Sequence, residues 1–231
     1  MQNEIKDTLK KHIQYVKGVG EARAKLFQNL NIFTIEELIT HFPREYEDRR
    51  HLKKIFQLED GESCSFEGII ASSVIESRIR QNLSVFKLFI EDETATIMAF
   101  WFNQDYIKKV FKPGDTYIFF GKISRKTKSF EVQNPVYEKV TSKEISAETS
   151  TELKNSCRII PIYPATERLT QNVIRSVIEH SLKLVIGNLE EVLSEEVRNR
   201  YTLSEVNDAM HNIHFPKSFE DFLNARRRLV F

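Results

Sequence analysis

Between residues 62 and 140, apolar and polar residues alternate along most of the chain, which is the period of β-strands that bury one face. Short polar stretches rich in turn residues interrupt the alternation. The pattern predicts five strands, at residues 62–74, 83–92, 95–102, 116–124 and 129–140. Because each strand must bury its apolar face, this part of the chain has to form a small sheet or barrel with a core of its own.

Between the third and fourth predicted strands lies NQDYIKKVF, which we interpret as a short helix with Asn103 as its cap. The sequence Lys112-Pro113-Gly114-Asp115 follows, with Pro and Gly at the positions that a type II turn requires. Three strands, a helix and a two-stranded hairpin are the element order of an OB-fold, a small Greek-key barrel. We therefore predict a five-stranded OB-fold β-barrel.

Segments on both sides of the barrel have helical periodicity, so the predicted fold class is α+β, with the barrel flanked by N-terminal and C-terminal helical segments. The first helical run has apolar residues at Ile5, Leu9, Ile13 and Val16. Thr34 and Glu37 predict a capping box for a later helix, TIEELITHF. C-terminal helices are predicted at residues 170–186, 190–201, 203–213 and 218–231. The predicted domains are a helical region at 1–50, the OB-fold domain at 51–140, a polar linker at 141–156 and a helical region at 157–231.

Two short segments resemble each other: HFPREYED, which begins at His41, and HFPKSFED, which begins at His214. Their flanking sequences do not match, which argues against an internal repeat. We interpret both as one way of leaving a helix, in which Pro stops the first helix and an acidic start opens the next.

The charge balance excludes binding that depends on overall charge. Lys and Arg number 34 against 33 Asp and Glu, so the net charge is +1 and a nucleic-acid site has to be a local patch. No apolar stretch approaches the ~20 residues that cross a bilayer, and we expect a cytoplasmic protein without a membrane partner. Cys64 and Cys157 lack metal-ligand spacing and are expected to be reduced thiols.

Sequence motifs of the common catalytic sites are missing. The chain has no G-x-x-x-x-G-K-[ST] phosphate loop, no G-x-S-x-G, no H-E-x-x-H and no G-x-G-x-x-G. His211 and His214 are three residues apart on a predicted helix but have no acidic or Cys partner at ligand spacing, so no metal site is predicted. We expect no catalytic residue and no cofactor in this chain, and the remaining signals indicate binding.

OB-folds bind oligonucleotides or oligosaccharides across one barrel face and through the loops that join strands one to two and four to five. Both loops are basic in this sequence, at residues 77–82 and 125–129. With the residue that precedes the second loop, the candidate phosphate contacts are Arg78, Arg80, Lys122, Arg125, Lys126 and Lys128. Such residues neutralise phosphates and release counterions. The alternative is that these loops are solvated hairpin tips, which commonly carry lysine.

The segment FWFNQDY supplies aromatic rings on which single-stranded bases can stack. By alternation, Phe100 and Phe102 share one strand face with Met98, whereas Trp101 lies on the other face, and one of the two faces is core. Phe102 has two open interpretations: a base-stacking ring, or a hydrophobic staple on Ile107. The segment VKGVGEARAKL also has two: half of a phosphate-binding helix-hairpin-helix, or a tight helix-packing turn.

Several separated segments occur in the same order as in the N-terminal part of RecG branched-DNA helicases, which this chain resembles over almost all of its length. The segments are KGVGEARAKLFQNLNIFTIEELITHFPREYEDRR, FWFNQDY, GKI with QNPVY, PIYPATERLTQNVIR and IHFPKSFEDFLNARRRLVF. The resemblance implies a wedge domain, an OB-fold with helical additions that recognises and splits branched DNA, such as stalled replication forks and Holliday junctions, in recombination and repair. It also implies helicase motor domains in the same polypeptide, with ATP and Mg as their cofactors.

In that family, an aromatic pair stacks on bases at the branch, and the resemblance places the pair on Phe102 and Tyr106. Two positions depart from the family pattern. EDETATI stands where a D-G-x-G turn is usual, and Arg168 stands where Gly is usual. Two other functions stay open, a stand-alone OB-fold module for single-stranded nucleic acid and a protein-interaction module. We expect the chain to be a monomer.

Overall fold

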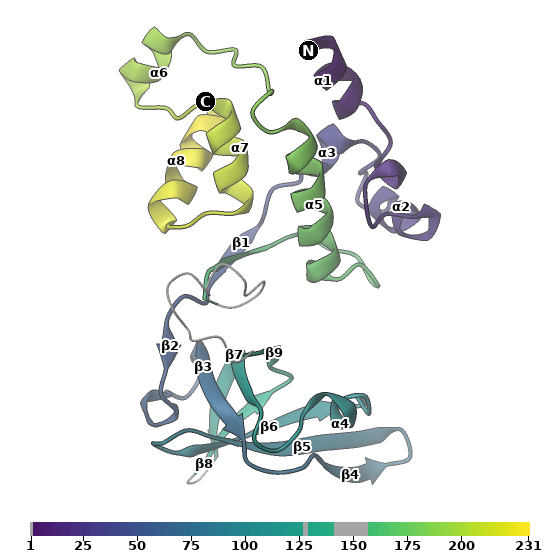
Figure 1. Cartoon of the computed structure of the whole chain (residues 1–231), viewed down its shortest axis with the longest axis vertical. Coiled ribbons are helices and arrows are strands. Elements are labelled where there is room, and N and C mark those ends of the chain that lie inside the picture. The colour runs from purple at the N-terminus through teal and green to yellow at the C-terminus, as the bar shows by residue number, and fades with distance from the viewer. Residues whose placement is uncertain (1, 127–128, 141–156) are drawn as a thin grey trace. The chain divides into compact units, whose positions relative to one another are not determined.

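The computed structural model describes residues 2–126, 129–140 and 157–231, which form two compact units (Figure 1). Unit 1 consists of Met1–Glu47 and Ile159–Phe231, and unit 2 consists of Asp48–Arg158. The predicted linker at residues 141–156 lies outside the described residues. Unit 2 is therefore one continuous stretch of chain, whereas unit 1 is assembled from both ends of the sequence.

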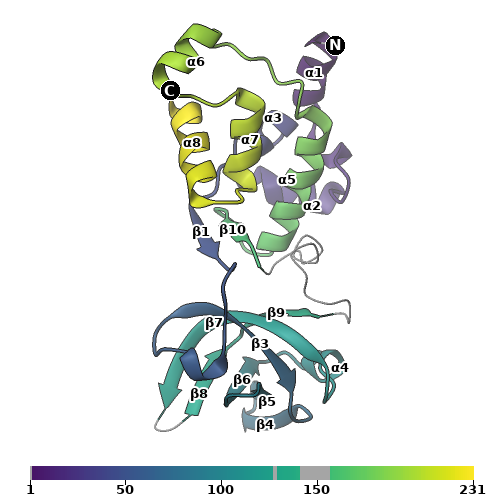
Figure 2. The same cartoon turned by 60° about the vertical axis from the view of Figure 1, so that its left-hand side comes forward.

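Unit 2 contains a closed five-stranded barrel, which confirms the predicted OB-fold and the α+β class (Figures 1 and 2). Its strands are β3 (Ser63–Ile70), β5 (Leu83–Glu91), β6 (Thr96–Phe102), β7 (Thr116–Lys126) and β8 (Ser129–Gln133). They follow the order β3-β5-β6-β8-β7, and β7 pairs with β3 to close the barrel. β6 runs parallel to β8, and the other neighbours in the barrel are antiparallel.

The prediction of a loop at residues 77–82 was wrong, because most of these residues belong to a strand. β4 (Ile75–Arg80) pairs with the first half of β5, and only Gln81 and Asn82 connect the two strands. β3 pairs with β5 only near the far end of β5, at Ile69 and Ile70. The other half of β5 would otherwise present an unpaired edge, and β4 covers it.

Two other boundaries differ from the prediction, both at asparagines with positive φ. Asn103 does not cap a helix: its φ is 51°, its side chain is used by another strand, and α4 (Ile107–Val110) begins only after Tyr106. The predicted strand at 129–140 is interrupted at Asn134, whose φ is 45°, so that β9 (Val136–Lys139) follows β8 as a separate strand. Asparagine tolerates this left-handed conformation better than most residues.

The turns that join the barrel strands are fixed by short polar contacts. The amide of Asp115 donates to the carbonyl of Lys112 at 3.1 Å and Gly114 has φ +88°, in agreement with the predicted type II turn. Between β5 and β6, burial alone would raise the pKa of Asp92. Hydrogen bonds from Thr94 and from the backbone amides of Ile55, Thr94 and Ala95 lower it to about 2. This carboxylate shapes the EDETATI turn without glycine.

The barrel core is aromatic. Four aromatic side chains in it are at most 1 % exposed: Phe66, Phe86, Trp101 and Phe119. Trp101 therefore marks the inner face of β6. At the seam of the barrel, a Cβ on Gly68 would come within 2.4 Å of the Ile90 side chain, so this glycine allows β3 to pass close to β5.

Unit 1 is helical apart from a two-stranded sheet of β1 (Glu45–Asp48) and β10 (Ile159–Ile162). Its N-terminal elements are α1 (Gln2–Leu9), the 3₁₀ turn η1 (Ile13–Tyr15), α2 (Glu21–Gln28) and α3 (Ile35–Ile39). Its C-terminal helices are α5 (Gln171–Val185), α6 (Glu195–Tyr201), α7 (Val206–His214) and α8 (Phe219–Val230). The predicted capping box of Thr34 and Glu37 is present at α3. The first helix is shorter than predicted because the amide of Ile13 bonds to the carbonyl of Phe33 at 2.9 Å instead of continuing the helix.

The two H-F-P segments meet in the core of unit 1. His214, at the end of α7, is fully buried, and its ring lies 5.9 Å from the ring of Phe42. Its Nε2 lies 2.7 Å from the carbonyl oxygen of Ile39, and its Nδ1 lies 2.8 Å from the hydroxyl of Tyr163. The first segment leads into β1 and the second into α8, so the expectation that both open a new helix was wrong for the first.

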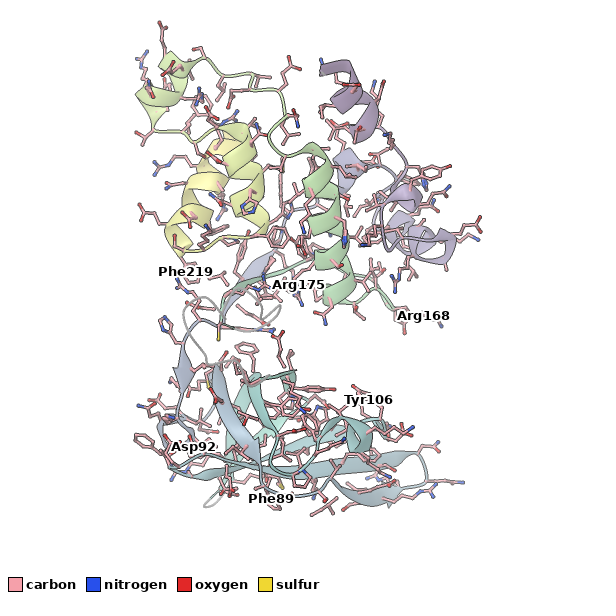
Figure 3. The ribbon with its side chains drawn as sticks, viewed as in Figure 1. Phe89, Asp92, Tyr106, Arg168, Arg175 and Phe219 are labelled. Atoms are coloured by element: carbon pink, nitrogen blue, oxygen red, sulfur yellow. The ribbon has the colours of Figure 1, made fainter. Side chains whose placement is uncertain are left out.

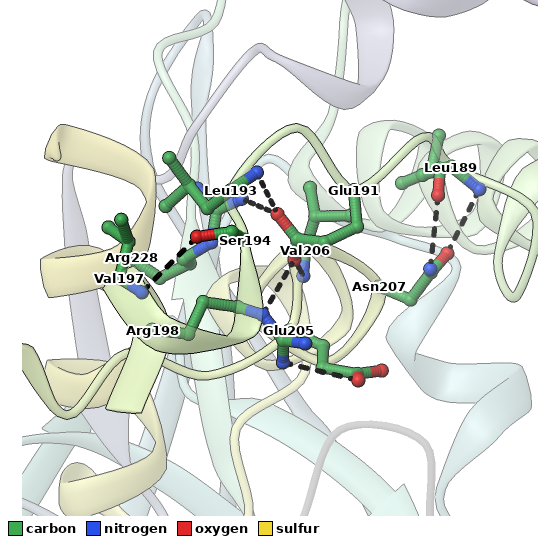
Figure 4. Close-up of polar contacts among 10 residues, drawn as sticks. All are labelled: Leu189, Glu191, Leu193, Ser194, Val197, Arg198, Glu205, Val206, Asn207 and Arg228. Atoms are coloured by element: carbon green, nitrogen blue, oxygen red, sulfur yellow. Dashed lines mark hydrogen bonds and ion pairs between the residues drawn. The ribbon is translucent and has the colours of Figure 1, made fainter. Parts of the chain in front are cut away.

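α6 begins later than predicted because the residues before it are held extended by side chains (Figure 4). The carboxylate of Glu191 accepts hydrogen bonds from the amides of Leu193 and Val206, both at 2.9 Å, and from the guanidinium of Arg228 at 2.6 Å. Asn207 uses its carboxamide in the same way on Leu189. These contacts tie the segment before α6 to α7 and α8.

Candidate nucleic-acid interface

The alternation in β6 resolves which aromatic side chains face outward. Ile97, Ala99 and Trp101 are buried, whereas Phe100 and Phe102 are only partly covered. The staple interpretation of Phe102 was wrong, because a staple residue directly precedes the cap and α4 starts after Tyr106. Phe102 is thus a ring on the outer face of the barrel.

Asparagine side chains fix the end of β6 in place. The carboxamide oxygen of Asn103 accepts from the amide of Ser84 at 2.9 Å, and its nitrogen donates to the carbonyl of Asn82 at 3.2 Å. Asn134 accepts from the amide of Phe102 at 3.4 Å. The β4–β5 hairpin and the end of β6 are therefore held together as one local structure, which we call the hairpin end of the barrel.

Arg78 and Arg80 lie at the hairpin end, but on different faces of β4. Arg80 pairs with Leu83. Leu83 lies on the same face of β5 as Val85, the residue opposite Phe102, so Arg80 and Phe102 share the outer face. Arg78 pairs with Ser84 and lies on the other face, and its guanidinium donates to the carbonyl of Gln81 at 3.1 Å. A bulge between the two arginines produces this change of side.

Tyr106 also lies at the hairpin end, directly before α4. Its side chain is 51 % exposed, and its hydroxyl donates to the carboxamide oxygen of Gln104 at 2.6 Å. Gln104 in turn contacts Asn134, the residue that also binds the Phe102 amide. Tyr106 and Phe102 are therefore positioned by one shared set of carboxamides.

The other candidate basic residues that the structure describes lie along β7. Arg125 is exposed, and its guanidinium lies over the ring of Phe130 at 5.5 Å from the ring centroid. Lys126 forms an ion pair with Glu131 at 3.1 Å. Lys122 is exposed in β7, opposite Ser63. Lys128 lies outside the described residues.

The structure does not bring the two basic groups together. Arg125 pairs with Phe130, which pairs with Ile97 at the start of β6, whereas Arg80 lies near Phe102 at its end. Phe102 and Ile97 are five residues apart along β6, which corresponds to about 17 Å in a strand. A ligand that touches both groups has to extend along the barrel.

Sequence reasoning missed part of the outer face. Phe89 in β5 is 40 % exposed and pairs with Met98, and Lys87 pairs with Phe100. Figure 3 shows Asp92 and Tyr106 toward opposite ends of unit 2, with Phe89 between them. The alternation of side chains that was used for β6 also applies to β5, and it would have predicted that Phe89 faces outward.

Other candidate features of the sequence contribute less. In the described ranges, no three His, Cys, Asp or Glu residues are grouped so as to hold a metal ion, and no helix is long and apolar enough to cross a membrane. Burial raises the pKa of the Cys64 thiol to about 12. Gly18 has φ +89°, and its carbonyl accepts from Arg23 at 2.6 Å. Arg168 has φ +71°, a conformation that glycine adopts more readily than other residues.

A family model and the curated relatives of this chain indicate one family. The RecG wedge domain family model matches residues 12–185. The ATP-dependent DNA helicase RecG of Thermotoga maritima is 33 % identical over 228 residues, which are 95 % of this chain and 27 % of the relative. RecG of Staphylococcus aureus strain NCTC 8325 is 28 % identical over 94 % of this chain and 30 % of its own length. This chain thus spans less than a third of these relatives.

A solved structure gives the same result for the fold. The structure of RecG bound to a three-way DNA junction matches with a TM-score of 0.80 and 32 % sequence identity. The match covers 96 % of this chain and 29 % of that chain. Both units of the present chain therefore fall within the matched region.

Proposed function

Because this chain belongs to the RecG wedge domain family, we propose that it is the branched-DNA-binding part of an ATP-dependent DNA helicase of the RecG type. In this proposal, the wedge recognises stalled forks and Holliday junctions and splits their strands in recombination and repair. The observation that carries the proposal is the hairpin end. There Asn103 joins the end of β6 to the β4–β5 hairpin that carries Arg80, and Asn134 and Gln104 bond to Phe102 and Tyr106.

The arrangement at the hairpin end suits a DNA branch for two reasons. A half-exposed tyrosine and an outward phenylalanine offer ring faces to unpaired bases, which exist at a branch and not within a duplex. Arg80, which shares the outer face of the hairpin end, can bind a phosphate of a strand that leaves the branch. Arg125 and Lys126 at the end of β7 add basic residues farther along the barrel for a DNA arm.

Helicase activity is proposed only for a longer protein. The chain has no phosphate-binding loop of the P-loop type, so the chemistry of ATP and Mg belongs to motor domains that the proposal places in the same polypeptide. A monomeric state and a cytoplasmic location stay predictions.

A competition gel tests the proposal directly. Labelled three-way junction is bound by the chain and challenged with unlabelled junction, duplex and single strand of equal nucleotide content. We expect the junction to compete best. Equal competition by single strand would favour a stand-alone single-strand-binding module, and no salt-sensitive binding to any DNA would favour a protein-interaction module.

Replacing either Phe102 or Tyr106 by Ala is expected to weaken fork binding by about 1 to 3 kcal/mol and to leave duplex binding nearly unchanged. The physical reason is that each ring stacks on an unpaired base. Because both rings face outward, the melting temperature is expected to fall little. Binding is measured by fluorescence anisotropy with fork and duplex, and melting by circular dichroism. A Phe102→Ala protein that melts far lower but keeps the fork preference would contradict the stacking role.

The double substitution of Lys126 and Lys128 by Ala is expected to reduce the dependence of log K on log salt by roughly 1.8, because each lost phosphate contact on duplex DNA removes about 0.9. Titrations of a junction with duplex arms at several salt concentrations measure this slope. Lys112→Ala, in the exposed turn before β7, is the matched control and should leave the slope unchanged. An unchanged slope in the double variant would show that Lys126 and Lys128 do not contact phosphates.

A further inference from the structure

An ion pair joins α4 to β4 at the hairpin end, and the proposed function gives this pair no role. The carboxylate of Glu76, in β4, accepts a hydrogen bond from the ammonium of Lys108, in α4. Figure 1 shows both elements at the same end of unit 2. Lys108 lies two residues after Tyr106, and Glu76 lies in the strand that carries Arg78 and Arg80. The pair therefore connects the helix next to the tyrosine ring to the strand of the two arginines.

The position of β4 depends on few contacts. β4 pairs with β5, and no other strand in the described part of unit 2 pairs with it. A bulge between Arg78 and Arg80 interrupts even this ladder. The twist between two strands is larger in a two-stranded ribbon than within a wider sheet. A side-chain contact with another element can therefore decide where the residues of β4 lie.

Lys108 is well placed to hold β4. Its neighbour Ile107 is fully buried and belongs to the barrel core, which anchors α4. The Lys108 ammonium also lies over the ring of Phe86, 5.3 Å from the ring centroid, and Phe86 is itself 1 % exposed. Phe86 pairs with Glu76 across the β4–β5 ladder, so the cation contacts both members of one cross-strand pair. The ion pair thus links β4 to the barrel core through α4.

The charges of this pair do not suit a direct role in DNA binding. A carboxylate on a hairpin that binds phosphates repels them, and the Glu76 side chain is 41 % exposed. Lys108 neutralises this carboxylate, so the two side chains together add no net charge to the surface. The pair also adds little to the stability of the barrel, because ion pairs between partly exposed side chains contribute little. Its main effect is on the position of β4 relative to α4.

We propose that Glu76 and Lys108 are positioning residues, whose ion pair holds β4 against α4 so that Arg80 and the ring of Tyr106 fit a DNA branch together. The inference rests on the proposed function and deepens it, because it names what makes the hairpin end specific for a branch. A branch offers an unpaired base and phosphates at the same time, whereas a duplex offers phosphates but no free base face. Loss of the pair therefore lowers the preference for a branch over duplex rather than DNA binding in general.

Two conservative substitutions with opposite charge changes test the inference. Glu76→Gln and Lys108→Met each keep most of the side-chain shape and remove one charge, so the first makes the chain more positive and the second makes it more negative. Fluorescence anisotropy measures the affinities of the complete 231-residue chain for a three-way junction and for duplex. We expect both variants to lower the ratio of junction affinity to duplex affinity about three-fold, because a partly exposed ion pair can bias an arrangement only by its own small free energy. Melting temperatures, followed by circular dichroism, should stay close to the wild-type value.

A double-mutant cycle shows whether the two residues act through each other. The chain with both Glu76→Gln and Lys108→Met should have the same affinity ratio as either single variant, since each substitution already breaks the one ion pair. The ion pair of Lys54 and Glu93, at 2.6 Å, is the matched control. Glu93 lies in the turn between β5 and β6, at the other end of β5 from the hairpin. Glu93→Gln and Lys54→Met should leave the affinity ratio unchanged.

The outcomes separate the inference from the proposed function. Similar falls of the ratio in both single variants, with no further fall in the double variant, support the inference. Opposite changes in the two single variants would show that the charges act on DNA directly, and unchanged ratios would show that the pair has no role. A large fall of the melting temperature in both would show that the pair is merely structural. Each of these three results overturns the inference, while a wild-type preference for junction over duplex keeps the proposed function. A wild-type chain without that preference overturns both.

Discussion

Acidification from neutral pH to pH 4 is expected to remove about 3 kcal/mol from the unfolding free energy of unit 1 through His214 alone. Burial lowers the pKa of His214 to about 4, and the hydrogen bond to the Ile39 carbonyl raises it only in part. A carbonyl can only accept, so Nε2 carries the proton and Nδ1 accepts from the Tyr163 hydroxyl. A second proton on Nδ1 would meet a hydroxyl donor in a buried site.

The direction follows from the two pKa values. The folded-state pKa of His214 lies below the ordinary value of 6.5, so the unfolded chain binds the proton more readily. The stabilising effect is complete above pH ~6.5 and is lost as the pH falls through about 4. Denaturant titrations at several pH values, followed by far-ultraviolet circular dichroism of the helices, measure the change.

His214→Gln isolates the effect of this one group. A glutamine amide can donate to the Ile39 carbonyl and accept from Tyr163, but it does not titrate. The variant should lose the His214 part of the pH dependence, while unfolding of the barrel, followed by Trp101 fluorescence, should respond to pH as in the wild type. The same slope in wild type and variant between pH 6.5 and 4 would contradict the assignment.

Glu191→Ala is expected to lower the unfolding free energy of unit 1 by about 3 kcal/mol. The substitution leaves the amides of Leu193 and Val206 without an acceptor and Arg228, which is 7 % exposed, without its carboxylate (Figure 4). A cation that is buried and unpaired costs more than the loss of a surface ion pair.

The neighbouring residue supplies the control. Glu190 forms an ion pair with Lys6 at 3.1 Å in which both side chains are at least half exposed, and Glu190→Ala should cost less than about 1 kcal/mol. Denaturant titrations followed by circular dichroism compare the two variants with wild type. Similar losses in both would show that the network around Glu191 is not what holds α6 to α8.

The sequence predicted elements that depend on local signals. The period of two located the barrel strands, and Thr34 with Glu37 located the start of α3, because these patterns act within a few residues. β4 was not predicted because it forms by pairing with an edge of β5, and a pairing between strands leaves no local sequence pattern. Asn103 was mistaken for a cap because its carboxamide bonds to Ser84, a residue distant in sequence.

The candidate site was predicted in its residue types but not in its geometry. The basic residues were expected as two loops that serve one ligand, and the strand register separates them by most of the length of β6. The side of β4 on which Arg80 lies depends on a bulge, which shifts every later side chain to the other face. The position of Phe89 beside Met98 could not be predicted without knowing that β5 pairs with β6.

The division of unit 1 between both ends of the chain has a consequence for how the molecule folds. Unit 2 is continuous from Asp48 to Arg158, and the amide of Arg49 bonds to the carbonyl of Arg158 at 3.0 Å, so its two ends lie side by side. Unit 1 can form only when the chain closes a loop that contains the whole barrel. The entropic cost of closing this loop is larger when the loop is unfolded than when it is folded with its ends adjacent. Folding of the barrel first brings Glu47 and Ile159 close together, and the helical unit can then assemble as if the two halves were nearly continuous.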